Sequence, residues 1–380
     1  MAEIKGLKEA AKKIKEEAER GTEIIVCADS DLDGVASAII LKDVIYNLSE
    51  RMPFLVFPDR EIEGYGLTPT TLAKISKKAP ALLITVDFGI SSFEEVKAAK
   101  RMGFYVIVVD HHEILERLPE ADIIINPRQP GDEYPFKKFA ACGLCLKLAE
   151  EILGEKMTQS QRENFYELAA IGTLADLMPR EGENESIVEQ GLKTIENSWR
   201  PAFNVFFKKT KGKSVMEKVS KLISLLYTRE IKNGLPLSFR FLTLVSEIEI
   251  ENFLSELKIK FEERKNKIQE LFEEIKERVS KEEPLIFEGS AHFEFSLISA
   301  VATRLCQKFK KPVFLYKKLN GICQGTARAP ETINLVELMK KSAPYLISFG
   351  GHPQAAGFRI LEENLERFKN DLISNLCTSP

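Results

Sequence analysis

Five short, continuously apolar segments recur in the first third of the chain, and segments of helical spacing separate them. The apolar segments are 23–28, 54–57, 81–86, 104–109 and 122–126. Strands that are apolar along their whole length are buried on both faces, which is typical of a parallel sheet covered by helices. The pattern therefore predicts an α/β fold with a parallel sheet. In such sheets, functional groups gather at the carboxyl ends of the strands.

The length of 380 residues exceeds what one hydrophobic core usually holds, which favours two domains. We expect residues 1–200 to form the parallel-sheet domain. Residues 201–283 are expected to form a helical connector, in which the dense charges of 248–280 indicate one long, solvated helix. Alternating β-rich and helical segments return in 284–380, so we expect a smaller second α/β domain there.

Composition excludes several classes of protein. The net charge of −3 argues against a strongly cationic nucleic-acid coat, and no apolar run approaches the length of a membrane span. The N-terminus lacks the apolar stretch of a signal peptide, so we expect a cytoplasmic protein with free thiols. Cys142 and Cys145 have C-x-x-C spacing, but no second pair completes a zinc site, and a buried helix is the better interpretation.

Three acids, Asp29, Asp31 and Asp33, follow the first apolar segment directly, and Gly34 comes after them. The alternate spacing is similar to the start of an EF-hand loop, but the twelfth position would be Ile40 rather than Glu, and a strand precedes it. We interpret the segment as a strand-to-helix turn that projects carboxylates above the sheet, with Gly34 relieving the turn. Helix capping would explain one of these acids but not three.

Further acids and two of the four histidines end other apolar segments: Asp87, then Asp110-His111-His112, and Asp176 at the end of an apolar helix. Each alone is an ordinary cap or turn residue, but together they predict a cluster at one edge of the sheet. So many carboxylates would repel one another, and bound divalent cations would remove that cost. Mixed Asp and His ligands without Cys favour Mn²⁺, or less exclusively Mg²⁺, with two ions able to hold a phosphoryl group.

In this order the motifs D-x-D-x-D-G, V-D-x-G, D-H-H and G-T-x-A-D resemble the metal motifs of the DHH phosphoesterase superfamily, in its RecJ-type single-stranded-DNA-specific exonuclease form. The segments between and after the motifs are also similar to that type. GTAR and FGGHPQAAGF, near the C-terminus, resemble its DHH-associated domain. The resemblance covers about 20–200 and 285–360, so we expect a catalytic core without the further oligonucleotide-binding barrel of many bacterial members.

The resemblance implies roles for individual residues. The implied metal ligands are Asp31, Asp33, Asp87, His111 and Asp176. Asp29 and His112 are implied catalytic residues that line the site, with His112 contacting or protonating the reacting phosphate. The implied substrate-binding residues are Arg304, Thr326, Arg328, Gly350, Gly351 and His352. We expect the last three to lie in a small-residue loop whose N–H groups and imidazole hold phosphate.

The chain also departs from the family pattern. Cys27 stands where several members have a histidine, and 228–241 does not match the Asn-Ala-Ala-Gly-Arg stretch of RecJ-type enzymes. A basic-aromatic stretch at 206–213 fits either a nucleic-acid contact or a solvated loop.

Three functions stay open. The first is a DNA-repair exonuclease that digests single-stranded DNA or RNA from an end. The second is a phosphoesterase for short oligonucleotides, cyclic dinucleotides or nucleotide phosphates. The third is a non-catalytic replication-complex scaffold, which the intact ligand set argues against.

Overall fold

The computed structural model describes residues 3–60, 62–114, 117–228, 230–280 and 282–377. The chain divides into two compact units, residues 1–258 and 259–380. A single long helix, α11 (Glu247–Arg278), begins in the first unit and ends in the second, as the charged segment predicted.

A five-stranded parallel sheet forms the centre of the first unit, as the apolar segments predicted. Its strands are β1 (Ile24–Ala28), β2 (Phe54–Val56), β3 (Leu82–Val86), β4 (Tyr105–Val109) and β5 (Ile123–Ile125). They lie in the order β2-β1-β3-β4-β5 and pair in parallel throughout. From β1 the chain adds β2 on one side and β3 on the other. The carboxyl ends of β1 and β3 therefore flank a topological switch point, where open α/β sheets commonly bind ligands.

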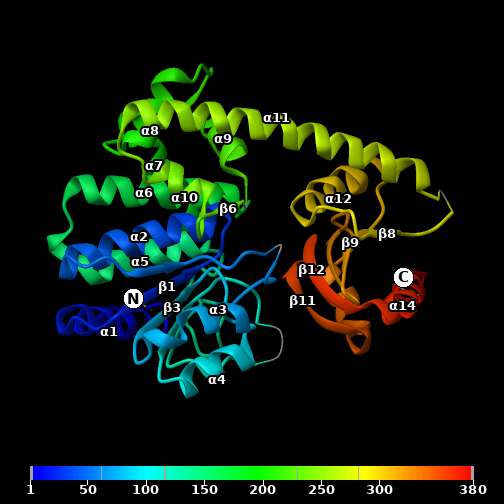
Figure 1. The fold of residues 1–380 in the computed structure, drawn as a ribbon, viewed down its shortest axis with the longest axis horizontal. Helices are drawn as coiled ribbons and strands as arrows, with labels where there is room; N and C mark the ends of the chain where they lie inside the picture. The colour runs from blue at the N-terminus through cyan, green and yellow to red at the C-terminus, as the bar shows by residue number, and fades with distance from the viewer. Residues whose placement is uncertain (1–2, 61, 115–116, 229, 281, 378–380) are drawn as a thin grey trace. The chain divides into compact units, whose positions relative to one another are not determined.

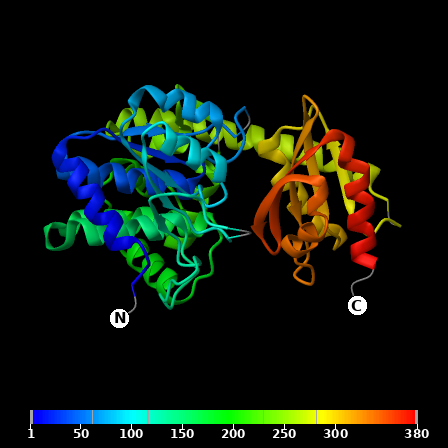
Figure 2. The ribbon, with the colours of Figure 1, turned by 90° about the horizontal axis from the view of Figure 1, so that it is seen from below.

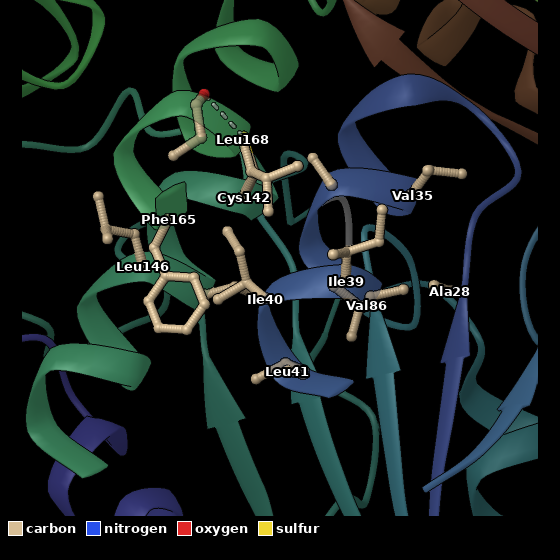
Figure 3. Close-up of a cluster of buried hydrophobic side chains, with 14 of the residues drawn as sticks. Ala28, Val35, Ile39, Ile40, Leu41, Val86, Cys142, Leu146, Phe165 and Leu168 are labelled. Carbon is tan, nitrogen blue, oxygen red and sulfur yellow. Dashed lines mark hydrogen bonds between the residues drawn. The ribbon is translucent and has the colours of Figure 1, made fainter. Parts of the chain in front are cut away.

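Helices cover both faces of this sheet (Figure 1). One face packs against α1 (Leu7–Arg20), α2 (Leu32–Ser49) and α5 (Ala141–Leu153), and the other against α3 (Pro69–Ile75) and α4 (Phe93–Arg101). Side chains of β1 alternate between the two cores because successive strand residues point to opposite faces. Figure 3 shows the larger core, where Ile39 and Ile40 of α2 lie among side chains of the strands, α5 and α6 (Gln159–Ala175).

The remaining helices of the first unit extend the larger core. They are α7 (Gly182–Thr194), α8 (Pro201–Lys209), α9 (Val215–Leu226) and α10 (Leu237–Leu242), with a hairpin of β6 (Ile231–Lys232) and β7 (Leu235–Pro236). Phe206 and Phe207 of α8 are buried in that core, whereas Lys208, Lys211 and Lys213 are exposed. The aromatic rings of the basic-aromatic stretch are therefore unavailable for stacking on bases. Since 201–258 packs into the first unit, the segment 201–283 expected as a connector divides between the two units.

The second unit is built on a mixed five-stranded sheet in the order β11-β12-β10-β9-β8. Its strands are β8 (Ile286–Ser290), β9 (Val313–Leu319), β10 (Ile322–Arg328), β11 (Leu346–His352) and β12 (Ala355–Leu361). Only the β8–β9 pair is parallel. One face packs against α12 (Phe295–Phe309) and the end of α11, and the other against α13 (Leu335–Lys341) and α14 (Leu365–Cys377), which lies beside the sheet in Figure 2.

The prediction of a small-residue loop around Gly350 and Gly351 is wrong. These residues belong to an antiparallel hairpin of β11 and β12. Gly350 pairs with Gly357, and Gly351 pairs with Ala356. A Cβ atom on Gly351 would lie 2.4 Å from the carbonyl oxygen of Ala355, and its φ is +137°. Close strand pairing is therefore the physical reason for glycine at position 351.

Among the described helices, none is both long and apolar enough to cross a bilayer. The cytoplasmic location expected from the N-terminus stays a prediction.

Candidate metal centre

Three acids occupy the first position after three adjacent parallel strands. Each donates its backbone N–H to the carbonyl of a residue in the neighbouring strand: Asp29 to Val86 at 3.2 Å, Asp87 to Val109 at 3.0 Å, and Asp110 to Ile125 at 3.0 Å. The sheet ladder thus continues one step beyond each strand. Because the strands are parallel, all three acids lie at the same edge of the sheet.

The turn from β1 into α2 supplies two more carboxylates. Asp31 is the N-cap of α2 and accepts a hydrogen bond from the backbone N–H of Gly34 at 3.2 Å. Asp33 accepts backbone N–H bonds from Ala141 at 2.7 Å and Cys142 at 2.8 Å, so the N-terminus of α5 orients its carboxylate.

Gly34 does not relieve the turn as expected, because it lies within α2 and is not among the positive-φ residues. A Cβ atom at this position would lie 2.5 Å from the carbonyl oxygen of Asp29. Close approach to the preceding strand end is therefore the reason for glycine here.

One of the acids sits on unusual backbone. Asp87 has a φ of +64°, in the left-handed region that non-glycine residues rarely adopt. Asp176 is the C-cap of α6, and its side chain is about a quarter exposed. Uncommon backbone conformations often cluster at functional sites, where the surrounding structure holds them.

His111 lies at the centre of the acids and is 1% exposed. Its Nε2 atom is 3.3 Å from a carboxylate oxygen of Asp87, 3.6 Å from one of Asp176 and 3.9 Å from one of Asp33. Three sets of ligand-type atoms lie within 4.8 Å of one another in the described residues: Asp87 with His111 and His112, Asp33 with His111 and Asp176, and Asp29 with Asp31 and Asp87. Since the sets share members, they form one connected cluster.

The electrostatics of this cluster fit bound cations. Burial, followed by the charges of Asp31, Asp33 and Asp176, raises the pKa of Asp87 well above its usual range. Burial also raises the pKa of Asp33 to about 6, and the charge of Asp31 adds to the shift, against the hydrogen bonds from Cys142 and Ala141. Ionised carboxylates crowded in this way repel one another, and divalent cations would compensate them. The oxygen and imidazole donor set matches Mn²⁺ or Mg²⁺.

Asp110 is a fully buried acid that organises the two histidines rather than joining the cluster directly. It accepts backbone N–H bonds from Ile90, His111 and His112 at 2.9, 2.8 and 3.1 Å. Its Oδ1 atom also lies 2.7 Å from Nδ1 of His112. Burial alone would raise the pKa of Asp110, but the His112 charge and these hydrogen bonds hold it well below its usual range. In turn, Asp110 raises the pKa of His112 above its usual value although burial opposes this shift.

Sequence reasoning missed two residues of the site, Arg60 and Tyr65. The Nε of Arg60 donates to Oδ1 of Asp29 at 2.7 Å, the guanidinium also bonds the other oxygen of Asp29, and it lies 3.6 Å from Asp31. The guanidinium stacks over the ring of Tyr65 at 4.4 Å. The Tyr65 hydroxyl donates to the carbonyl of Asp87 at 3.2 Å and lies 3.4 Å from Nε2 of His112. Both residues follow β2 at the same sheet edge, which is the signal that could have found them.

The structure brings together all the residues expected at this edge: Asp29, Asp31, Asp33, Asp87, His111, His112 and Asp176. Cys27 lies away from them, because it is fully buried with Ile25 and Leu83 in the core on the other face of the sheet. Cys142 and Cys145 are buried in α5, as expected.

The residues expected to bind substrate lie in the second unit. Arg328 donates to Thr326 Oγ1 at 2.9 Å and to Thr303 Oγ1 at 3.2 Å, and Ser299 also bonds Thr326. Together they form a polar cluster between α12 and β10. Arg304 instead donates to Gln269 of α11 at 3.0 Å.

Comparison with known proteins identifies relatives along the whole chain. Residues 23–173 match the DHH family, N-terminal domain, and 285–377 match the DHHA1 domain. The chain is 32% identical to the single-stranded-DNA-specific exonuclease RecJ of Bacillus subtilis, over 99% of this chain and 49% of that protein. It is 27% identical to the protein of that name from Thermus thermophilus, over 96% of this chain and 54% of that protein. The chain thus spans about half the length of these two relatives.

Among solved structures, exonuclease RecJ bound to manganese matches with a TM-score of 0.80 and 25% identity. That match covers 100% of this chain and 96% of the solved chain. The similarity therefore extends over both units of the fold.

Proposed function

Because this chain belongs to the DHH family, we propose that it is a metal-dependent phosphodiesterase that shortens single-stranded DNA from one end. The observation that carries the proposal is the connected cluster of buried and half-buried carboxylates around His111 at the carboxyl edge of the parallel sheet. Its donor set suits divalent cations that act on phosphate esters.

We infer that five side chains hold the cations: Asp31, Asp33, Asp87, His111 and Asp176. Bound Mn²⁺ or Mg²⁺ would neutralise charge on the phosphoryl group and acidify the attacking water. Asp29 keeps its place within the cluster through its bonds to Arg60. The intact set of ligands opposes the alternative of a non-catalytic scaffold.

His112 is the residue best suited to meet the reacting phosphate. It is 27% exposed at its side chain, unlike the buried His111. Asp110 holds its Nδ1 atom and favours the protonated imidazole, so that Nε2 can donate a proton or hydrogen bond to a phosphate oxygen. Tyr65 limits the orientation of the same ring from the other side.

In the second unit, we propose that the polar cluster around Thr326 and Arg328 binds substrate phosphate, because a guanidinium and adjacent hydroxyls can form charge-assisted bonds with phosphate oxygens. Arg304, Gly350, Gly351 and His352 stay proposed substrate-binding residues of the same unit. The choice of single-stranded DNA as substrate rests on the relatives, whose names specify it.

End-labelled DNA and RNA strands of graded length, digested with Mn²⁺, test this function. We expect single-stranded DNA to be shortened progressively, duplex DNA to resist, and chelator to abolish the reaction. Asp87→Asn should remove turnover because it deletes a central carboxylate. Asp122→Asn is the matched control, because Asp122 bonds Val106 at the opposite, amino edge of the same sheet. Cleavage of dinucleotides alone would favour the short-substrate alternative, and full activity of Asp87→Asn in chelator would refute the proposal.

A further inference from the structure

Leu177 is the most exposed large apolar side chain in the part of the chain that the structure describes, at 88%. It follows directly after Asp176, a member of the acid cluster. An exposed leucine alone is common on protein surfaces. Its backbone makes this one unusual.

The end of α6 has the geometry of a Schellman motif. The N–H of Leu177 bonds the carbonyl of Leu174 at 3.3 Å, and the N–H of Met178 bonds the carbonyl of Thr173 at 3.2 Å. In this motif the residue after the C-cap adopts the left-handed conformation, and glycine is the usual residue there because it has no Cβ. Leu177 holds that position with a φ of +57°. Folding stability therefore favours glycine at 177 on two grounds, backbone strain and apolar exposure.

Leu177 directly follows a residue of the candidate metal cluster in the sequence. The Asp176 carboxylate lies 3.6 Å from Nε2 of His111, so the next residue lies at the rim of the cluster. On the neighbouring His112, the hydroxyl of the partly exposed Tyr65 lies 3.4 Å from Nε2. Two partly or fully exposed side chains with apolar parts, Leu177 and Tyr65, thus adjoin members of the cluster, Leu177 in sequence and Tyr65 by contact. A ligand that matches this arrangement combines a charged phosphate with an apolar body, as a nucleotide does and inorganic polyphosphate does not.

We propose that Leu177 contacts the base or sugar of the nucleotide beside the reacting phosphate, and thereby makes the site select nucleoside-bearing phosphodiesters. The inference rests on the proposed function and adds the specificity element of the same site. Apolar packing of this kind tolerates any base, because every base offers an apolar face.

The test compares two single strands: one with ordinary nucleotides, and one whose last residues at both ends lack bases (tetrahydrofuran analogues). For Leu177→Gly we expect kcat/KM on the ordinary strand to fall by about fivefold to thirtyfold, the factor for losing part of a leucine contact. On the baseless strand, kcat/KM should stay within about twofold of wild type. Leu177→Met should retain most of the preference, because it keeps an apolar side chain.

Glu50→Gly is the matched control. Glu50 also ends a helix in the left-handed conformation, with φ of +56°, but it is remote from the carboxyl edge of the sheet. Both glycine variants should melt at the wild-type temperature or above, with Mn²⁺ affinity unchanged, and Glu50→Gly should keep the wild-type substrate preference.

The outcomes separate this inference from the proposed function. If wild type cleaves neither strand, the function itself is refuted. If wild type cleaves DNA and Leu177→Gly keeps the same preference, the inference alone is overturned. An equal loss on both strands, or weaker Mn²⁺ binding, would also overturn it, because Leu177 would then act only by shaping the backbone of Asp176.

Discussion

Replacing Asp33 by Asn should stabilise the metal-free protein and destabilise the metal-loaded one. Asp33 is 2% exposed, and its pKa is raised to about 6. Against an ordinary aspartate near 3.9, the shift of about 2 units corresponds to about 3 kcal/mol of unfavourable ionisation at neutral pH. Asn removes this charge but can accept only one of the two backbone bonds from Ala141 and Cys142, which costs about 1–2 kcal/mol. The net gain without metal is about 1–2 kcal/mol.

The stability difference between Asp33→Asn and wild type depends on pH because the pKa of Asp33 is raised. An ionised Asp33 costs stability above about pH 6, and this cost disappears as the pH falls toward the unfolded-state value. The advantage of Asp33→Asn should therefore shrink between about pH 7 and pH 4. Excess Mn²⁺ should reverse the order of stability. At about 100 times its Kd, Mn²⁺ stabilises wild type by about 2.7 kcal/mol, and a variant that lacks the Asp33 carboxylate gains only part of this stabilisation.

Urea unfolding in chelator and in Mn²⁺, followed by tryptophan fluorescence, measures this crossover. Trp199 is the only tryptophan of the sequence and lies in the first unit, so its signal reports the unit that holds the cluster. Glu167→Gln is the matched control. Burial likewise raises the pKa of Glu167, but this acid lies outside the candidate ligand sets. Its variant should shift stability equally in both buffers.

Two results would refute the reasoning. If Asp33→Asn is less stable than wild type in chelator, the ionised carboxylate is not destabilising. If Mn²⁺ stabilises variant and wild type equally, Asp33 is not a metal ligand.

The remaining predictions concern the groups around the cluster. Asp110→Asn removes the charge that raises the pKa of His112, so the alkaline limb of the pH–rate profile should move to lower pH, and kcat should fall by about tenfold to a hundredfold for one lost charge-assisted bond. A profile identical to wild type would exclude a protonated His112 from the reaction. Cys27→Ala leaves a small cavity in a closed core and should lower the free energy of unfolding by about 1–2 kcal/mol in urea titrations. Its Mn²⁺ affinity should be unchanged, and a loss of affinity would place Cys27 in the metal site.

The parallel sheet and the position of its acids could be predicted from the sequence. Continuous apolar segments indicate strands that are buried on both faces. The residues that directly follow parallel strands then lie at one edge of the sheet. Asp29, Asp87 and Asp110 each follow such a strand directly, so their convergence needed no tertiary information. Asp176 was grouped with them as an acid that ends an apolar helix, and the structure shows that α6 brings it to the site from outside the sheet.

Other features depended on contacts between distant segments. Arg60 and Tyr65 lie in a loop without periodicity, and only the folded chain shows that they contact Asp29 and His112. The different roles of Asp110 and His111 within D-H-H were also hidden in the sequence. The two residues have similar burial, but His111 is a member of the metal cluster, whereas Asp110 orients the histidines. The hairpin around Gly351 was missed because small residues are typical of loops and of tightly paired strands alike.

Calorimetric titration of the metal-stripped protein with Mn²⁺, beside Asp87→Asn, tests the central claim most directly. Asp87 lies 3.3 Å from His111 and belongs to two of the three candidate ligand sets. We predict saturable binding of two ions by wild type, with release of protons because carboxylates of raised pKa must ionise. In Asp87→Asn at least one of these binding events should be lost. Absence of binding by wild type, or an unchanged titration in the variant, would contradict a metal centre at the carboxyl edge of the sheet.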